Sequence, residues 1–376
     1  MRDVAVISVA QTPARRRVKE QNEVEMLMPA IHAALSQVDM TIDDIGFTCS
    51  GSTDYLAGVG FSFVSTLDGV GPWPPIQESH VEMDGAWALY EAWVKLQLGE
   101  LDTALVYSYA KSSPGDLPMV LTRQLDPITV APLWPDSVSL AALQARALID
   151  AGKITEEQMC EVAVRSRRAA LGNPNAQLAW DRPDAELLAE EHHIAPLRKS
   201  DCAPITDGAA AIVLAAGDAA RDRVERPAWI RGIDHRVESI HLGHRDLTVS
   251  ESTRIAAEKA GVADGTIDVA ELHAPFSHQE LILREALGLG PEVDVNPSGG
   301  ALAANAMMTA GLIRIGEVAN RISAGQAERG VAHATSGPCL QQNLVCVLEA
   351  DPPRTGARSG RQDDPNARRN GAGGGD

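Results

Sequence analysis

An internal repeat limits the fold of this chain more than any other feature of its sequence. Gly85 follows a polar run and opens an apolar helix, and Gly299-Gly300 open a second apolar helix over residues 301–315. A predicted strand precedes each helix, over 45–50 in the first copy and 267–272 in the second. The copies lie roughly 215 to 225 residues apart, which indicates a duplicated unit of strands and helices.

Strands and helices alternate along both copies. The other predicted elements are strands over 4–10, 103–109, 205–215, 331–335 and 344–348 and helices over 23–38 and 251–260. This alternation is typical of an α/β fold and predicts a mostly parallel sheet with helices on its faces. We divide the chain into an N-terminal half, residues 1–220, and a C-terminal half, residues 221–351.

Three stretches depart from the repeat. Residues 61–75 are rich in Gly and Pro, which predicts a loop. Residues about 111–200 carry recurring prolines and two helices with clear apolar faces, over 140–151 and 156–170. They predict a loop domain inserted into the first half, and an ordinary extended surface segment is the alternative. Residues 352–376, rich in Arg, Gly, Asp and Asn, are predicted to be a disordered tail.

The composition argues against several classes of protein. The net charge of -18 should repel nucleic acid and anionic membranes. We see no signal peptide and no apolar run long enough to cross a bilayer, so we expect a cytoplasmic protein. The five cysteines, Cys49, Cys160, Cys202, Cys339 and Cys346, lack the spacing of metal ligands. Gly69-Val70-Gly71 lacks the strand-to-helix context of a dinucleotide loop, so we expect neither a metal nor a tightly bound cofactor.

The start of the first apolar helix, within residues 79–89, is the first candidate site. Asp84 suits the N-cap position, and its charge suits the positive end of the helix dipole. The helix is apolar on most faces, which predicts that it is buried. A buried helix whose N-terminus opens to a pocket can hold an anion or activate a nucleophile.

Four further motifs suggest a family. They are Cys-Ala-Pro-Ile-Thr-Asp-Gly-Ala-Ala-Ala over 202–211, Glu-Leu-His-Ala-Pro-Phe over 271–276, Asn-Pro-Ser-Gly-Gly over 296–300, and the turn from Gly337 to Cys339. Their order and spacing over residues 3–350 resemble the thiolase superfamily, and within it the sterol-carrier-protein-2-type thiolases, also called lipid-transfer proteins. The resemblance implies a five-layer αβαβα fold of two similar halves, a loop domain that shapes an acyl-CoA site, and a homodimer.

The resemblance also implies a catalytic set from which this sequence departs. In thiolases a nucleophilic cysteine starts the first buried helix, and aligning Gly85 with the family glycine places Glu82 at that position. No cysteine occurs between Cys49 and Cys160. Ala306 falls where the family has the histidine of a Gly-His-Pro motif. His273 matches its family position, whereas Cys339 lies two residues from the family's second cysteine, where Gly337 falls.

These departures change the expected chemistry. Thiolysis needs a covalent acyl carrier, and a glutamate would form a mixed anhydride that is far more reactive than a thioester. Retro-aldol cleavage of a β-hydroxyacyl-CoA needs only a base and hydrogen-bond donors for the thioester enolate. The resemblance implies that relatives lacking the cysteine do this on sterol side chains, typically with a small OB-fold, zinc-ribbon (DUF35) partner.

Each candidate residue has a functional and a structural interpretation. His273 would be an oxyanion donor or acid/base, or else a core histidine bonded to backbone. Cys339 would protonate the enolate carbon, or else be a buried inert thiol. Glu82 or Asp84 would be the general base, unless Asp84 is a plain N-cap and Glu82 only fills space. Asn305 would donate a hydrogen bond in place of the lost histidine, or merely sit in the helix.

The remaining candidates would bind substrate. Gly337 would offer a backbone N–H to the oxyanion, and Ser298, Gly299 and Gly300 would form the substrate-binding turn. Two weaker candidates for other roles are His278, which lies more than one helical turn beyond His273, and Tyr55, a phenolic acid/base candidate that no motif supports. We therefore expect lipid or steroid side-chain catabolism on a coenzyme A thioester. Two alternatives stay open: a non-catalytic acyl-CoA-binding or scaffold subunit, and an acyltransferase that uses Cys339.

Overall fold

The computed structural model describes residues 2–350. The predicted disordered tail, 352–376, lies outside the described residues. The strands are β1 (Val4–Gln11), β2 (Phe47–Gly51), β3 (Glu78–Val81), β4 (Thr103–Ala110), β5 (Gly208–Ala216), β6 (Ala228–Val237), β7 (Val269–Leu272), β8 (Asp294–Val295), β9 (Arg329–Ser336) and β10 (Gln342–Glu349). The α-helices are α1 (Glu23–Ser36), α2 (Asp54–Ala57), α3 (Ser62–Val70), α4 (Gly85–Gln97), α5 (Leu117–Arg123), α6 (Ser137–Asp150), α7 (Glu156–Ala169), α8 (Asp184–Leu188), α9 (Asp218–Arg221), α10 (Glu251–Ala260), α11 (Ser277–Leu287), α12 (Gly300–Ala303) and α13 (Ala310–Ser323). Short 3₁₀ helices occupy η1 (Ile42–Asp44), η2 (Ala131–Leu133), η3 (Ala170–Gly172), η4 (Lys199–Asp201), η5 (Leu242–His244) and η6 (Val262–Asp264).

The strand order shows the predicted duplication. The order is β3-β2-β4-β5-β1-β6-β10-β9-β7-β8, so each half contributes five strands and the second half mirrors the first. The halves join where β1 pairs with β6, at Ala5 opposite Trp229 and Val6 opposite Ala228. The prediction of a mostly parallel sheet is wrong. Among the strand pairs of residues 2–350, only β2 with β3 and β4, and β7 with β8 and β9, are parallel. The chain leaves the sheet at the carboxyl end of β4, forms the loop domain and enters the sheet again at that same end. Strand β5 therefore runs antiparallel to β4.

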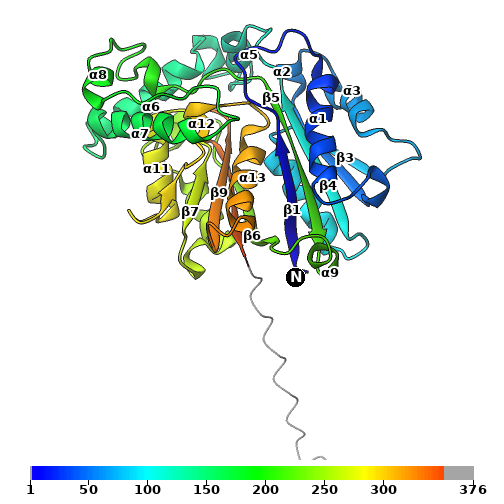
Figure 1. Ribbon diagram of the computed structural model, residues 1–376. Coiled ribbons are helices and arrows are strands. Elements are labelled where there is room, and N and C mark those ends of the chain that lie inside the picture. The colour runs from blue at the N-terminus through cyan, green and yellow to red at the C-terminus, as the bar shows by residue number, and fades with distance from the viewer. Residues whose placement is uncertain (1, 351–376) are drawn as a thin grey trace, which may run out of the picture.

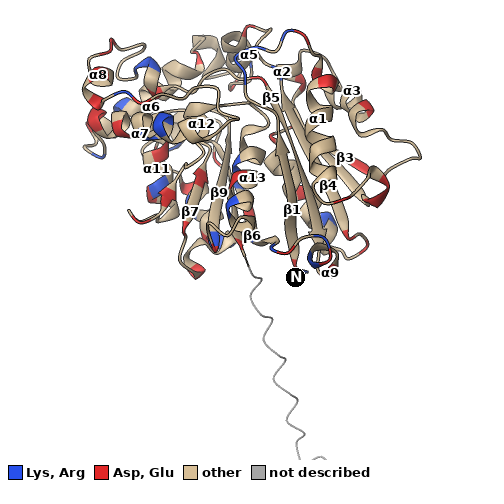
Figure 2. Ribbon diagram, viewed as in Figure 1, with Lys and Arg blue, Asp and Glu red and all other residues tan. Residues whose placement is uncertain are grey.

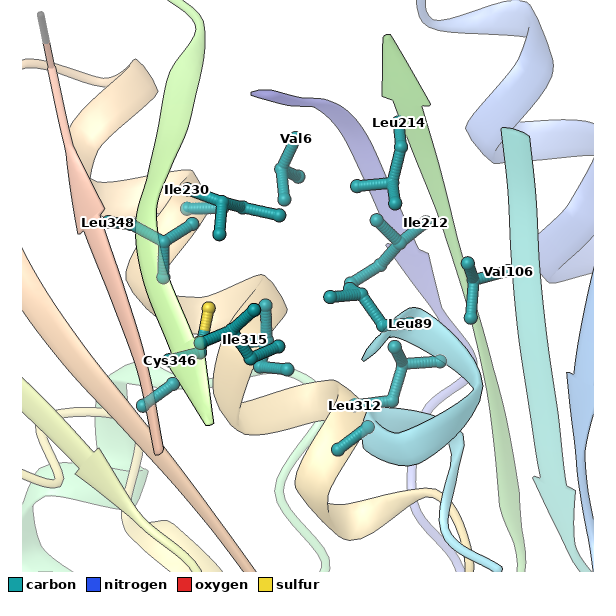
Figure 3. Packing of buried hydrophobic residues seen from close by; sticks show 14 of the residues in the cluster. Val6, Leu89, Val106, Ile212, Leu214, Ile230, Leu312, Ile315, Cys346 and Leu348 are labelled. Carbon is teal, nitrogen blue, oxygen red and sulfur yellow. The ribbon is translucent and has the colours of Figure 1, made fainter. Parts of the chain in front are cut away.

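Alternating side chains divide the molecule into five layers. In β1, Val4 and Val6 face one apolar core whereas Ala5 and Ile7 face another. The first core encloses α4 and α13 between the strands of the two halves, as Figure 3 shows for Leu89, Leu312 and Ile315. Helix α1 covers the outer face of the first half, and α10 and α11 cover that of the second. The layers therefore follow the order αβαβα, as the resemblance to the thiolases implies (Figure 1).

Local predictions differ from the structure at several elements, of which the following are the clearest. Helix α3 lies within 61–75, where a loop was predicted, and β6 and α11 were not predicted at all. The predicted helix over 301–315 is wrong. The structure has the short α12, a turn over 304–309 in which Met308 adopts φ +70°, and then α13. The counterpart of α4 in the second half is therefore α13 and not the helix that Gly300 opens.

The inserted segment covers the second half. Helices α6, α7 and α8 lie together above the strands of that half (Figure 1). Val162 and Val164 of α7 pack in one apolar cluster with Leu302 of α12. Charged side chains are absent from β1 and β5 and are frequent on α7 and α11 (Figure 2). Among residues 2–350, no helix is long and apolar enough to span a membrane.

Candidate functional site

The candidate residues gather at one edge of the sheet, where the parallel strands end. His273 directly follows β7, and Glu82 directly follows β3. Thr335 lies near the end of β9, and Asn305 lies in the turn between α12 and α13. In open α/β sheets, ligands commonly bind outside the carboxyl ends of the strands. The strand topology therefore brings residues from both halves to one edge.

His273 and Asn305 form the best-defined pair at this edge. The backbone N–H of Thr335 donates to Nδ1 of His273 over 3.3 Å, which makes Nδ1 the unprotonated nitrogen. The ring proton therefore lies on Nε2, which donates to Oδ1 of Asn305 over 3.0 Å. Burial lowers the pKa of His273 to about 4, although the Asn305 hydrogen bond opposes this, and the Arg314 charge lowers the pKa further. His273 is thus a neutral donor at physiological pH.

Asn305 is held at two points and keeps one polar group free. Its backbone N–H donates to Oγ1 of Thr206 over 3.0 Å, and Thr206 is completely buried. Its Oδ1 accepts from His273. Its Nδ2 has no hydrogen bond to any residue of the described chain, and it is not among the solvent-excluded unpaired atoms. Because the turn replaces the predicted helix, the side chain can reach His273 and leave Nδ2 as a donor.

Asp84 connects the two central helices. It is the N-cap of α4, and its Oδ1 accepts from the backbone N–H of Ala86 over 2.8 Å. Its two oxygens also accept from the backbone N–H groups of Gly311 and Leu312, at 2.9 and 3.1 Å, in the first turn of α13. Burial raises the pKa of this carboxyl, and the three N–H donors oppose the rise. The structure therefore places Asp84 as a cap for two helices.

Glu82 lies outside this buried region. Its side chain is 49% exposed. Its Oε1 accepts from the hydroxyl of Thr53 and the backbone N–H of Asp54, at 2.9 and 2.7 Å, where α2 begins. Nε2 of His80 lies 3.3 Å from the other oxygen. Glu82 is thus an accessible carboxylate beside a histidine, held at the end of β3.

Cys339 lies in the turn between β9 and β10. Its thiol is buried and donates to the carbonyl of Leu140 over 3.4 Å, among apolar residues of the loop domain. Burial raises its pKa to about 11, although the Arg245 charge opposes the rise. Arg245 donates to the carbonyls of Cys339 and Pro338, at 3.1 and 2.9 Å, and so fixes the turn. Gly337, in the same turn, is exposed and adopts φ +75°.

The Ser298-Gly299-Gly300 turn packs against buried groups. Ser298 donates through its N–H and hydroxyl to Glu271, at 2.9 and 2.7 Å. Arg314 donates to Glu271 and to the Ser298 hydroxyl, both at 2.8 Å, in a buried cluster. Gly299 adopts φ +95°, and a Cβ there would lie 2.7 Å from the Cβ of Ala170. The turn therefore requires glycine because of its conformation and its close approach to the loop domain.

Two weaker candidates lie away from the pair. His278 is completely buried and bonds to Oε1 of Gln144 over 3.2 Å, and burial lowers its pKa to about 3. Tyr55 is 58% exposed on α2. Thr206 was not among the predicted site residues, although it belongs to the 202–211 motif. The Glu271–Arg314 pair was not predicted either, and the Glu-Leu-His motif was the available signal for it.

The site contains no recognisable metal centre. Within residues 2–350, no group of three or more His, Cys, Asp or Glu side chains is arranged to hold a metal ion. What the edge offers is a neutral histidine and a spare amide donor on one side, and an accessible carboxylate on the other. Such groups can polarise a carbonyl oxygen and move a proton.

Comparisons with known proteins agree with this architecture. No family model matches the sequence. An acetyl-CoA acetyltransferase of Methanothermobacter thermautotrophicus is 26% identical over 366 residues, which cover 90% of this chain and 95% of that protein. Sterol carrier protein 2 of Bos taurus is 25% identical over 256 residues, which cover 58% of this chain and 47% of that longer protein.

Solved structures show the same fold. The Ltp2-ChsH2(DUF35) aldolase matches with a TM-score of 0.75 at 18% identity, over 93% of this chain and 98% of that one. Human mitochondrial 3-ketoacyl-CoA thiolase in complex with CoA matches with a TM-score of 0.73 at 16% identity, over 93% and 98% of the two chains. With its two mirrored halves and five layers, the chain has the fold of these thiolase structures, and its sequence is similar to proteins of the thiolase superfamily.

Proposed function

We propose that the protein cleaves a carbon–carbon bond of a β-hydroxyacyl-CoA thioester by a retro-aldol reaction, in lipid or steroid side-chain catabolism. The observation that supports this most is the His273–Asn305 pair. Nε2 of the neutral His273 ring donates to Oδ1 of Asn305 over 3.0 Å, and Nδ2 of Asn305 remains as an unused donor. An enolate oxygen needs a fixed donor of this kind.

The reaction needs no covalent intermediate. The Glu82 carboxylate takes the proton of the β-hydroxyl, and the O–H electron pair forms the new carbonyl. The Cα–Cβ bond breaks, and its electron pair becomes the thioester enolate, whose oxygen accepts from Nδ2 of Asn305. A proton then returns to Cα. The products are a ketone or aldehyde and a shortened acyl-CoA, so atoms and charge balance.

Glu82 suits the role of base better than Asp84. The Asp84 oxygens are already bonded to three backbone N–H groups of two helices. Glu82 is accessible, and its Oε2 faces only His80. Cys339 suits proton return less well than the sequence suggests, because its S–H is directed at the Leu140 carbonyl.

Two other functions were open from the sequence. A thiolase using Cys339 needs its thiolate, and a pKa of about 11 leaves roughly one thiol in ten thousand ionised at neutral pH. This opposes the acyltransferase alternative. The second candidate is a non-catalytic acyl-CoA-binding subunit. It is favoured by the bonds of Glu82 to Thr53 and Asp54, which also suit a purely structural cap.

The proposal extends to partners and location. Strand β3 is the outermost strand on its side of the sheet, so one of its sides pairs with no other strand of the described residues. Exposed Phe61 and Trp73 lie on the segments before β3. Both features support a homodimer in which β3 lies at the interface. The likeness to the Ltp2-ChsH2(DUF35) aldolase supports a small DUF35 partner. All five cysteines lie within the described residues and form no disulfide there. Free thiols are usual in the reducing cytoplasm and support that location.

The test uses the full chain, alone and with any OB-fold protein encoded beside it. A β-hydroxyacyl-CoA with a branched or ring-attached β-carbon is incubated with the protein, and free ketone and shortened acyl-CoA are followed by mass spectrometry. We expect cleavage, a large loss in Glu82→Gln and His273→Ala, and full activity in Glu78→Gln. Glu78 is a matched control because it is an exposed glutamate at the start of β3, the strand that Glu82 directly follows.

A parallel assay supplies β-ketoacyl-CoA and free CoA. Thiolysis that Cys339→Ala abolishes would replace the aldolase proposal with the acyltransferase. If neither cleavage nor thiolysis is detected while the protein still binds a CoA thioester, the non-catalytic subunit would be favoured.

A further inference from the structure

A narrow hollow lies beside the turn that carries Asn305. Met307 and Met308 of that turn line one side. Residues at the ends of β2 and β4 and in α2 line the other, namely Ser52, Thr53, Leu56, Ala57, Tyr109, Ala110, Lys111 and Ser112. The hollow therefore lies between the two halves, at the same sheet edge as the candidate site. Thr53 also donates to Glu82, which connects the hollow to the proposed base.

Ser112, one of the residues that line this hollow, carries an unexplained hydroxyl. Ser112 is only 4% exposed, and its Oγ has no hydrogen-bond partner among the described residues. A buried hydroxyl without a partner costs about 1–3 kcal/mol. The neighbouring residues do not share this property. Ser113 donates to Asp207 over 2.6 Å, and Lys111 donates to the carbonyl of Gln21.

The size of the hollow restricts its occupant. Its volume is about 10 Å³. That is close to the space needed by one water-sized group. Two methionines, two alanines and Leu56 supply apolar walls, while Ser112 supplies an unpaired hydroxyl. The matching chemistry is a single acceptor oxygen attached to an apolar chain.

We infer that this hollow is a subsite for the β-oxygen of the acyl group, with Ser112 Oγ as its donor. The inference deepens the proposed function and rests on it, because it assumes an acyl-CoA bound beside Asn305. In the reaction the β-oxygen changes from hydroxyl to carbonyl, and both can accept from Ser112. The subsite would thus hold the oxygen throughout, while Asn305 serves the thioester oxygen.

The test measures binding of a ligand that cannot undergo retro-aldol cleavage. Acetoacetyl-CoA carries a β-carbonyl, and butyryl-CoA has the same chain without it. Calorimetric titration of the full chain should show a preference for acetoacetyl-CoA of about tenfold, the value of one buried hydrogen bond. Ser112→Ala should abolish this preference and leave butyryl-CoA binding unchanged. Ser65→Ala, whose hydroxyl bonds within α3, should keep it.

The other outcomes either overturn the inference or separate it from the proposed function. Equal affinities of the wild-type protein for the two ligands would show that the hollow does not bind the β-oxygen. A preference that survives in Ser112→Ala would place the β-oxygen elsewhere. A Ser112-dependent preference without cleavage of any β-hydroxyacyl-CoA would uphold the subsite and reject the aldolase function. Cleavage without this preference would do the reverse.

Discussion

Two histidine–asparagine pairs lie on neighbouring strands of the second half, and their differences separate function from structure. His273 follows β7 and bonds to Asn305, and His333 of β9 bonds to Asn343 of β10, in each case over 3.0 Å. All four residues are buried. Burial lowers the pKa of His273 to about 4 and that of His333 to about 3. Burial and pKa alone therefore do not distinguish a functional pair from a structural one.

The amide groups of the two asparagines distinguish them. Nδ2 of Asn343 donates to the Ser252 hydroxyl and the Leu340 carbonyl, at 2.7 and 2.8 Å, so its donors are used within the fold. Nδ2 of Asn305 has no such partner among the described residues. The lesson is that unused hydrogen-bonding capacity at a strand end marks a candidate site better than a shifted pKa does.

The largest expected effect is on catalysis by the first pair. Asn305→Ala removes the spare donor, and loss of one oxyanion donor typically lowers kcat by about 10²–10³-fold. We expect that loss for cleavage of a β-hydroxyacyl-CoA, with KM changed far less, measured by steady-state kinetics. Asn343→Ala, the matched control, should lower kcat far less in the fraction that remains folded. Equal losses in both variants would contradict the distinction.

The second expected effect is on the free energy of unfolding. Here the variant of Asn343 should lose more than the variant of Asn305. Asn343→Ala leaves His333 and the Leu340 carbonyl without a buried partner, which should cost about 2–4 kcal/mol of unfolding free energy. Asn305→Ala loses only the His273 bond and should cost about 1–2 kcal/mol. Urea unfolding monitored by circular dichroism measures both. A larger cost at Asn305 would assign that residue a structural role.

The smallest effect is the pH dependence of the second pair. His333 has a pKa of about 3 when folded and about 6.5 when unfolded, so between these values only the unfolded chain binds the proton. Stability from neutral His333 is therefore present above pH 6.5 and is lost as pH falls, by up to about 1.4 kcal/mol per pH unit. His333→Gln lacks this term, so its stability deficit should be smaller at pH 5 than at pH 7. A deficit independent of pH in urea titrations would exclude this burial effect.

The sequence predicted the larger features of the fold better than the details of the site. The repeat and the buried strands follow from apolar patterning that extends over many residues, and the five layers are what the resemblance to the thiolases implies. The turn at 304–309 does not, because its residues are as apolar as the helices around it. Asn305 and Thr206 meet across 99 positions of sequence, and Asn343 lies in no recognisable motif. Such contacts depend on tertiary packing, which a short pattern does not record.

The position of Asp84 has a consequence for how the molecule unfolds. One carboxylate serves backbone N–H groups of α4 from the first half and of α13 from the second. If either half opened, the other would retain a helix end without its cap and a poorly compensated buried charge. The halves repeat one another in architecture, yet neither contains a complete central layer. The duplicated units are therefore expected to melt as one cooperative body, with no stable half-folded form between.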